Sequence, residues 1–261
     1  MTQEPPGETG TAGEVLGGGN SNRVVKDGDS VIRQTGPWSP FVHHLLRYLA
    51  AHGFTASPVV IEATASTERL SFLAGDVGND PLAPEVQTDQ VLIDAARLLR
   101  RFHDLTAHFV IPEGAVFQLP PASDPPWDVI CHNDFAPYNC VFRAGRLVGV
   151  IDFDTAGPGS RLWDIAYAVY RFVPLMHDAH AQANGWHPIP DRARRLRLFC
   201  DAYGLDDPAA RAALIETVIA RLTSLIDYIR QAATTLEDIP LYQRDIAYIG
   251  ENREVFARAL T

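Results

Sequence analysis

The chain has 261 residues, of which 46% are hydrophobic, 21% charged and 9% aromatic, a composition typical of globular proteins. It excludes collagen, coiled coils and wholly disordered chains, and the length leaves room for one large domain or two lobes. The 32 acidic residues outnumber the 22 Lys and Arg and give a formal net charge of −10, so we expect no nucleic-acid partner.

Residues 1–13 are polar and rich in Gly, Pro and Thr, and they resemble neither a secretory signal nor a transit peptide. We expect a disordered tail here. No stretch approaches the ~20 apolar residues of a membrane-spanning helix, so we expect no membrane partner. The cysteines, Cys131, Cys140 and Cys200, form no C-x-x-C pair, which argues against a disulfide framework or a zinc ribbon. These features favour a cytoplasmic protein.

The first part of the chain has the pattern of a small antiparallel sheet. A glycine loop at Gly17–Asn22 precedes the first two strands, and Asp27-Gly28 supplies the tight turn between them. The pair Ser39-Pro40 is typical of a helix start. We expect strands at residues 23–25, 30–34, 59–63 and 69–73, and a helix at residues 39–53.

Residues 74–81 are rich in Gly, Asp and Pro and carry no apolar period, so we place a linker there. It separates an N-terminal lobe, residues 14–74, from a C-terminal lobe, residues 75–261. The second lobe has mostly the helical period of apolar residues. We expect its helices at residues 88–106, 162–174, 191–203, 208–231 and 241–259. The sequence thus predicts an α+β protein with a small antiparallel β-rich lobe and a larger, mostly helical lobe.

The most informative segment of the chain lies at residues 129–154. Two apolar strands bracket a polar loop that holds His132, Asp134 and Asn139, and the returning strand ends at Asp152. Each residue alone is also common as a turn former or a helix cap. Together they suit phosphoryl transfer from a nucleotide, which needs a carboxylate for the proton of the attacking hydroxyl and oxygen ligands for Mg²⁺.

His132, Asp134 and Asn139 match the kinase catalytic-loop pattern H-x-D-x-x-x-x-N, and Asp152 falls where a kinase places a metal-binding Asp. With the Cys-His-Asn-Asp string and the downstream Asp164, the chain resembles the aminoglycoside phosphotransferase and choline kinase family. This resemblance implies a two-lobed protein-kinase-like fold that uses ATP and Mg²⁺. It implies Asp134 as the catalytic base, Asn139 and Asp152 as metal ligands, and His132 and Asp164 as structural supports of the loop.

The same resemblance places the nucleotide in the N-terminal lobe. Backbone N–H groups of a glycine loop can approach phosphates closely. Gly18, Gly19 and Asn20 fit this role loosely, because the third glycine of G-x-G-x-x-G is missing. Ser71 and Leu73 match the family's hinge, against which the adenine would lie.

Arg33 stands where kinases carry a Lys on the third strand, and we assign it to the phosphates because Arg can grip phosphate bidentately. The following helix, Ser39–His52, contains no Glu to pair with this cation, and His43 and His44 are poor substitutes. The Lys–Glu ion pair of kinases is therefore expected to be missing, which makes turnover a question for experiment.

The acceptor pocket must come from the helical lobe, and no A-P-E motif follows Asp152, so a protein substrate is disfavoured. Carboxylates that would suit a cationic acceptor lie at Glu216, Asp227, Glu237, Asp238 and Asp245. Trp163, Tyr167 and Tyr170 follow a helical spacing, which favours core packing over a cation–π cage.

We therefore expect an ATP- and Mg²⁺-dependent phosphotransferase that acts on a hydroxyl of a small cationic molecule, such as an aminoglycoside-like antibiotic, as a monomer or homodimer. Two alternatives stay open. One is a metabolic kinase for choline, thiamine or a sugar, and the other is a non-catalytic immunity protein that sequesters a toxic small molecule or peptide. Arg33 and the missing helix Glu motivate the second alternative, while the intact Asp134, Asn139 and Asp152 argue against it.

Overall fold

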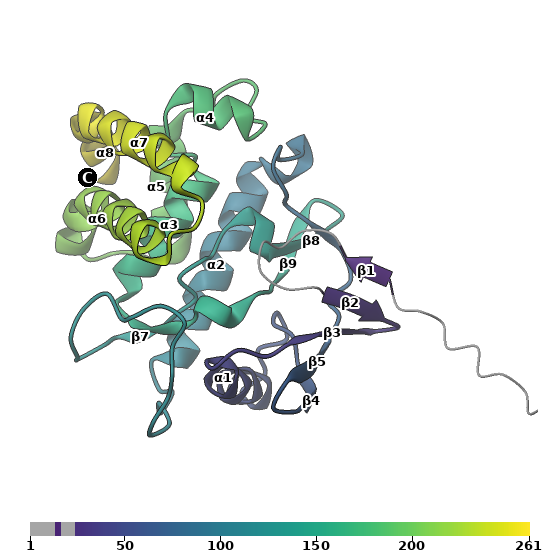
Figure 1. The fold of residues 1–261 in the computed structure, drawn as a ribbon. Coiled ribbons are helices and arrows are strands. Elements are labelled where there is room, and N and C mark those ends of the chain that lie inside the picture. The colour runs from purple at the N-terminus through teal and green to yellow at the C-terminus, as the bar shows by residue number, and fades with distance from the viewer. Residues whose placement is uncertain (1–13, 17–23) are drawn as a thin grey trace, which may run out of the picture.

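The computed structural model describes residues 14–16 and 24–261, and its N-terminal part is a five-stranded antiparallel sheet with the strand order β1-β2-β3-β5-β4 (Figure 1). The strands are β1 (Glu14–Leu16), β2 (Val24–Asp27), β3 (Ser30–Gln34), β4 (Val60–Ala63) and β5 (Thr67–Ser71). One helix, α1 (Ser39–Ala51), contacts β4 and turns its apolar side chains inward. This part is the small β-rich lobe that the sequence predicts.

The rest of the chain is mainly helical and lies beside the sheet (Figure 1). Its helices are α2 (Asp89–Thr106), α3 (Arg161–Phe172), α4 (Asp178–Ala183), α5 (Arg192–Tyr203), α6 (Pro208–Ala232), α7 (Ile239–Glu251) and α8 (Arg253–Leu260). Its short strands are β6 (Asp76–Val77), β7 (Val129–Cys131), β8 (Cys140–Arg143), β9 (Arg146–Val150) and β10 (Gly157–Gly159). They form a three-stranded sheet, β6-β8-β9, and a pair, β10-β7. The α+β architecture with a larger helical lobe is as predicted.

The predicted linker at residues 74–81 is more ordered than its composition indicated. Asp76 and Val77 form β6, which pairs with β8 opposite Phe142 and Val141. Gly75 permits this pairing, because a Cβ at that position would lie 2.4 Å from the Phe142 carbonyl oxygen, and its φ of +148° is one that L side chains rarely adopt. The segment thus ties the end of the first lobe to the sheet of the second.

The single helix expected at residues 241–259 is two helices. The chain leaves helical geometry at Asn252, whose side-chain amide donates to the Tyr248 carbonyl oxygen of α7 at 2.9 Å. The Asn252 carbonyl oxygen then accepts the N–H of Phe256 in α8. Asn competes for nearby backbone groups in this way, so it favours helix ends over helix interiors.

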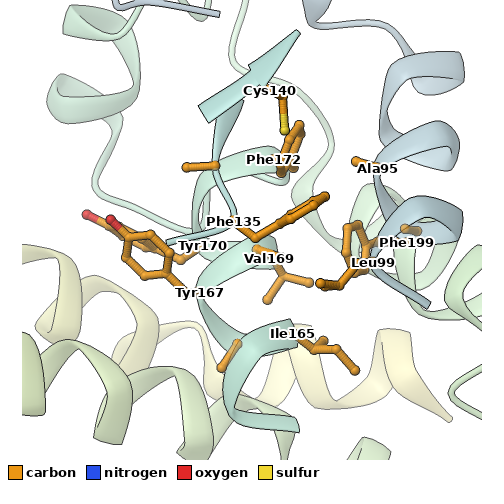
Figure 2. Packing of buried hydrophobic residues seen from close by; sticks show 14 of the residues in the cluster. Ala95, Leu99, Phe135, Cys140, Ile165, Tyr167, Val169, Tyr170, Phe172 and Phe199 are labelled. Atoms are coloured by element: carbon orange, nitrogen blue, oxygen red, sulfur yellow. The ribbon is translucent and has the colours of Figure 1, made fainter. Parts of the chain in front are cut away.

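The core of the helical lobe forms where α2 packs on α5 and α3 packs on α6. Figure 2 shows Phe135 pointing into this packing, among Leu99 of α2 and Val169 and Phe172 of α3. Phe135 is 1% exposed. Because Phe135 follows Asp134 directly, burial of its ring fixes the candidate catalytic loop to the core.

None of the helices in the described ranges has the length and apolarity to cross a bilayer. All three cysteines are buried free thiols, as expected from the absence of a C-x-x-C pair. Burial raises the pKa of Cys200 to about 12, so this thiol stays protonated and unreactive.

Candidate active site

Asp164 of α3 fixes the backbone of the candidate catalytic loop. Its carboxylate accepts the backbone N–H groups of His132 and Asn133, at 2.7 and 2.8 Å. It also contacts Nε2 of His103 at 3.0 Å, and the other ring nitrogen of His103 contacts the Tyr203 hydroxyl. Burial alone would raise the pKa of Asp164, but the hydrogen bonds from His103 and the loop hold it below its usual value. Asp164 therefore stays ionised inside the core and anchors the loop.

His132 braces the loop against the strand that returns to the site. Its Nε2 donates to the Ile151 carbonyl oxygen at 3.1 Å, and its ring centroid lies 4.8 Å from that of Phe153. The His132 carbonyl oxygen accepts the Thr155 hydroxyl at 2.9 Å. The ring has no exposed surface, so it holds the loop and β9 together and does not face a substrate.

Asp134 lines a cavity between the two lobes, and both of its carboxylate oxygens accept hydrogen bonds. The Tyr138 hydroxyl donates to one oxygen at 2.5 Å, and the Asn139 amide donates to the other at 2.8 Å. The Tyr138 hydroxyl also lies 2.8 Å from the Tyr167 hydroxyl. Burial raises the pKa of Asp134, and the Tyr138 hydrogen bond opposes this effect. The carboxylate is thus held in one orientation with increased basicity, which suits a proton acceptor.

Asn139 and Asp152 line the same cavity and offer oxygen ligands. The Asn139 Nδ2 donates to the backbone oxygen and the carboxylate of Asp134, at 3.0 and 2.8 Å, which leaves Oδ1 for a ligand. The Asp152 side chain is 50% exposed, and its backbone is left-handed, with a φ of 60°. One amide and one carboxylate oxygen fit Mg²⁺, which takes few protein ligands and keeps waters and phosphate oxygens. Within residues 14–16 and 24–261, no group of three or more His, Cys, Asp and Glu could hold a metal by itself.

Arg33 of β3 is the centre of a cluster of charges. Its Nε donates to Glu68, its partner in the register of β3 and β5, and its terminal nitrogens donate to Asp154 at 2.5 Å and Asp152 at 3.2 Å. Glu68 is 2% exposed, and its other oxygen contacts His43 of α1. Burial alone would lower the pKa of Arg33, but the three carboxylates raise it overall. For Asp154, burial dominates, and its pKa lies above the usual value.

The structure corrects one expectation about this cation. Helix α1 contains no Glu, as the sequence shows. Arg33 nevertheless forms an ion pair with a buried carboxylate, that of Glu68 on β5. The alternation of buried and exposed residues along β5 places Glu68 on the inner face with Leu70. This alternation was the signal from which Glu68 could have been identified.

The cavity has a volume of about 1150 Å³ and is lined by both lobes. Ser71 and Leu73 lie on its wall where β5 leaves the sheet, and the Ser71 hydroxyl accepts the Val59 N–H at 2.8 Å. Apolar side chains that line the same region and could enclose a flat ring are Val24, Val31, Leu70, Val141 and Ile151. The predicted phosphate-loop residues Gly18, Gly19 and Asn20 lie outside the described residues, and their role remains a prediction.

Most of the carboxylates expected to attract a cationic acceptor lie outside this cavity. Asp245 has no exposed surface and accepts the Tyr170 hydroxyl at 2.7 Å, so both residues belong to the core. Glu216 forms an ion pair with Arg253. Of the five carboxylates predicted for this role, Asp227 alone lines the cavity.

Trp163 and Tyr167 do line the cavity, but the protein's own cation lies against them. The guanidinium of Arg221 lies over both rings, 5.5 Å from the centroid of Trp163 and 4.8 Å from that of Tyr167. Arg221 of α6 is 6% exposed and donates to the Asn133 carbonyl oxygen at 2.7 Å. The sequence contained a signal for Arg221, because it follows Leu214 and Val218 on the buried face of α6.

The two-lobed structure has the protein-kinase-like fold. The structure aligns with an amicoumacin kinase in complex with AMP-PNP, Ca²⁺ and Ami, at a TM-score of 0.68 and 14% identity, over 96% of this chain and 92% of the other. It aligns with a choline/ethanolamine kinase family protein from Mesorhizobium loti at a TM-score of 0.61 and 18% identity, over 97% and 92% of the two chains.

Sequence comparison shows the family. A model described as "Phosphotransferase enzyme family" matches residues 113–198, which include the candidate catalytic loop. The trifolitoxin immunity protein of Rhizobium leguminosarum bv. trifolii is 32% identical over 235 residues, which cover 85% of this chain and 85% of that protein. The chain therefore belongs to the phosphotransferase enzyme family.

The buried pair of Arg33 and Glu68 yields a prediction about stability. Glu68→Ala leaves a buried guanidinium with less compensation, so the free energy of unfolding in urea should fall by about 3 kcal/mol. Glu62→Ala removes an exposed carboxylate from neighbouring β4 and should change it by less than about 0.5 kcal/mol. Equal losses in the two variants would show that the Glu68 pair does not hold the small lobe together.

The anchoring role of Asp164 yields a second prediction. Asp164→Asn lowers the number of acceptor oxygens, so the amide hydrogens of His132 and Asn133 should exchange with D₂O about 10-fold faster or more, as expected for losing hydrogen bonds to a charged group. Mass spectrometry of peptides that contain the loop measures this exchange. Asp206→Asn changes an exposed Asp and serves as the control. Unchanged exchange in Asp164→Asn would contradict the anchoring role.

Proposed function

We propose that the protein is an ATP- and Mg²⁺-dependent phosphotransferase that transfers the γ-phosphate to a hydroxyl group of a small molecule in the cytoplasm. The observation that carries this proposal is the meeting of Asp134, Asn139, Asp152 and Arg33 in one cavity. These residues come from three separate strands or loops, and burial in this cavity raises the pKa of Asp134, a combination typical of functional sites.

In this reaction the acceptor hydroxyl replaces the Tyr138 hydroxyl as hydrogen-bond donor to Asp134. The hydroxyl oxygen attacks the γ-phosphorus, the bond from that phosphorus to the β–γ bridging oxygen breaks, and ADP leaves. The hydroxyl proton passes to the Asp134 carboxylate, whose raised pKa assists this transfer. The supporting hydrogen bond from Asn139 keeps the carboxylate turned toward the cavity.

Asn139 Oδ1 and the Asp152 carboxylate would hold Mg²⁺, which when bound neutralises charge on the phosphates. Arg33 would bind the phosphates through its terminal nitrogens, which contact Asp152 and Asp154 in this structure, while its Nε stays on Glu68. Glu68 thereby does for Arg33 what a helix Glu does for the Lys of kinases.

The cationic acceptor expected from the sequence finds little support around the cavity. Asp227 is the one carboxylate of the expected set that lines the cavity. Its Oδ1 already forms an ion pair with Nη1 of Arg230 at 3.2 Å. We therefore propose a hydroxyl-bearing small molecule without requiring a net positive charge.

A second candidate function rests on the 32% identity to a protein named for trifolitoxin immunity. In this alternative the chain binds a toxic compound in the same cavity without transferring phosphate. The hydrogen bond from Tyr138 to Asp134 and the ion pairs of Arg33 would then be permanent features of a binding protein.

Asp134→Asn distinguishes the two functions. The amide keeps the shape of the side chain but cannot accept the hydroxyl proton, so ADP release with the acceptor should fall by about 10²-fold or more. Melting temperature and ATP affinity should hardly change, because the variant removes a desolvated charge and no buried volume. An active phosphotransferase with unchanged turnover in Asp134→Asn would overturn the catalytic assignment, and full protection of cells by this variant would favour sequestration.

A further inference from the structure

Tyr138 supplies the candidate catalytic base with a hydrogen-bond donor from within the protein. Its hydroxyl donates to Asp134 Oδ1 at 2.5 Å, while the Asn139 amide donates to Oδ2 at 2.8 Å. Asp134 and Tyr138 both line the cavity, so this hydrogen bond lies where an acceptor hydroxyl has to approach the base. Tyr138 therefore competes with any other hydroxyl for Asp134 Oδ1.

The Tyr138 hydroxyl has a second partner within hydrogen-bond distance. The Tyr167 hydroxyl of α3 lies 2.8 Å away. A phenol has a single O–H donor, so the proton of Tyr138 can point to Asp134 or to Tyr167. Rotation of the O–H bond exchanges one partner for the other, and the ring does not have to move. The hydroxyl can thus release Asp134 without losing its own hydrogen bond.

Packing holds the ring of Tyr138 in this place. The guanidinium of Arg171 lies 5.1 Å from the centroid of the ring, and it donates to Asp80 at 2.8 Å on its other side. The Arg171 side chain is 9% exposed, so its position is set by the surrounding protein. The distance between the Tyr138 hydroxyl and Asp134 is therefore a built feature of the cavity wall.

Water competes with the acceptor in any phosphoryl transfer of this kind. In hydrolysis, the water oxygen attacks the γ-phosphorus, the bond from that phosphorus to the β–γ bridging oxygen breaks, ADP leaves, and the water proton passes to Asp134. A hydrogen bond from O–H to a carboxylate is stronger than one between neutral groups. A water molecule has no further contacts with which to displace Tyr138, whereas an acceptor gains binding free energy from the rest of the cavity wall.

We propose that Tyr138 is a positioning residue that occupies Asp134 Oδ1 until an acceptor binds, and that it thereby suppresses hydrolysis of ATP. When the acceptor binds, the Tyr138 O–H turns to Tyr167, and the acceptor hydroxyl takes its place on Asp134. This inference rests on the proposed function, because it concerns the base of that reaction.

Tyr138→Phe tests this proposal with MgATP and water alone. The variant keeps the ring beside Arg171 and loses only the hydroxyl. Release of inorganic phosphate from MgATP should rise by about 10-fold or more, as expected for losing a hydrogen bond to a charged group. Tyr48→Phe is the matched control and should leave this rate unchanged, because the Tyr48 hydroxyl donates to the Leu105 carbonyl oxygen at 3.0 Å and does not line the cavity.

The rise also has to depend on the base. The double variant Tyr138→Phe with Asp134→Asn should lose the added phosphate release, because an amide cannot accept the water proton. A residue that only supports the structure of the loop would give a slower reaction when it is changed, and not a faster one. The direction of the change in Tyr138→Phe thus separates the two roles.

Carbon-13 NMR of the Asp side-chain carboxyl groups measures the same contact without turnover, with the Asp134 signal assigned from Asp134→Asn. The Tyr138 hydrogen bond lowers the pKa of Asp134, so the titration midpoint of Asp134 should move to higher pH in Tyr138→Phe. The other groups that act on this carboxylate, His132, Asp152 and Arg221, are the same in both proteins.

The outcomes separate this inference from the proposed function. Isothermal titration with MgATP should give the same affinity for wild type and Tyr138→Phe, and failure of the wild-type protein to bind MgATP overturns the phosphotransferase. Binding of MgATP with unchanged or slower phosphate release in Tyr138→Phe overturns the role of Tyr138 and leaves the phosphotransferase in place. An unshifted midpoint of Asp134 overturns the role of Tyr138 as well.

Discussion

The rest of the site depends on the charge cluster at Arg33. This one guanidinium joins Glu68 of the sheet to Asp152 and Asp154 of the helical lobe, so it sets how the walls of the cavity meet. Buried ions need compensation, and Glu68 in turn is shared with His43 of α1. The positions of α1, of β3 and β5, and of the Arg33 guanidinium in the small lobe therefore depend on one another.

Different contacts fix the candidate catalytic loop. The Asp164 carboxylate accepts hydrogen bonds from the loop's backbone N–H groups, and the buried ring of Phe135 points into the core (Figure 2). These contacts lie on the inner side of the loop and leave Asp134 on the cavity side. The helical lobe thus positions the loop with Asp134, while β3 of the sheet supplies the Arg33 guanidinium. The proposed reaction needs both groups.

The sequence was sufficient for features that are local in the chain. The spacing of Asp134, Asn139 and Asp152 lies within one strand-loop-strand unit, and the lobes follow from hydrophobic periodicity. For Glu68 and Arg221 the residue pattern indicates only that each lies on a buried face, because their partners depend on strand pairing and on the packing of α6 against the loop. The break at Asn252 was hidden by an apolar period that continues through both helices.

The central claim is that Asn139, Asp152 and Arg33 form a site for a metal-bound triphosphate. Because three carboxylates surround Arg33, phosphates alone would meet strong repulsion there, and a divalent cation would relieve it. Isothermal titration of ATP into the wild-type protein, with Mg²⁺ and then with EDTA, measures this directly. We expect the affinity for ATP to be at least about 10-fold higher with Mg²⁺, a difference of about 1.4 kcal/mol in binding free energy. Equal affinity under the two conditions would contradict it.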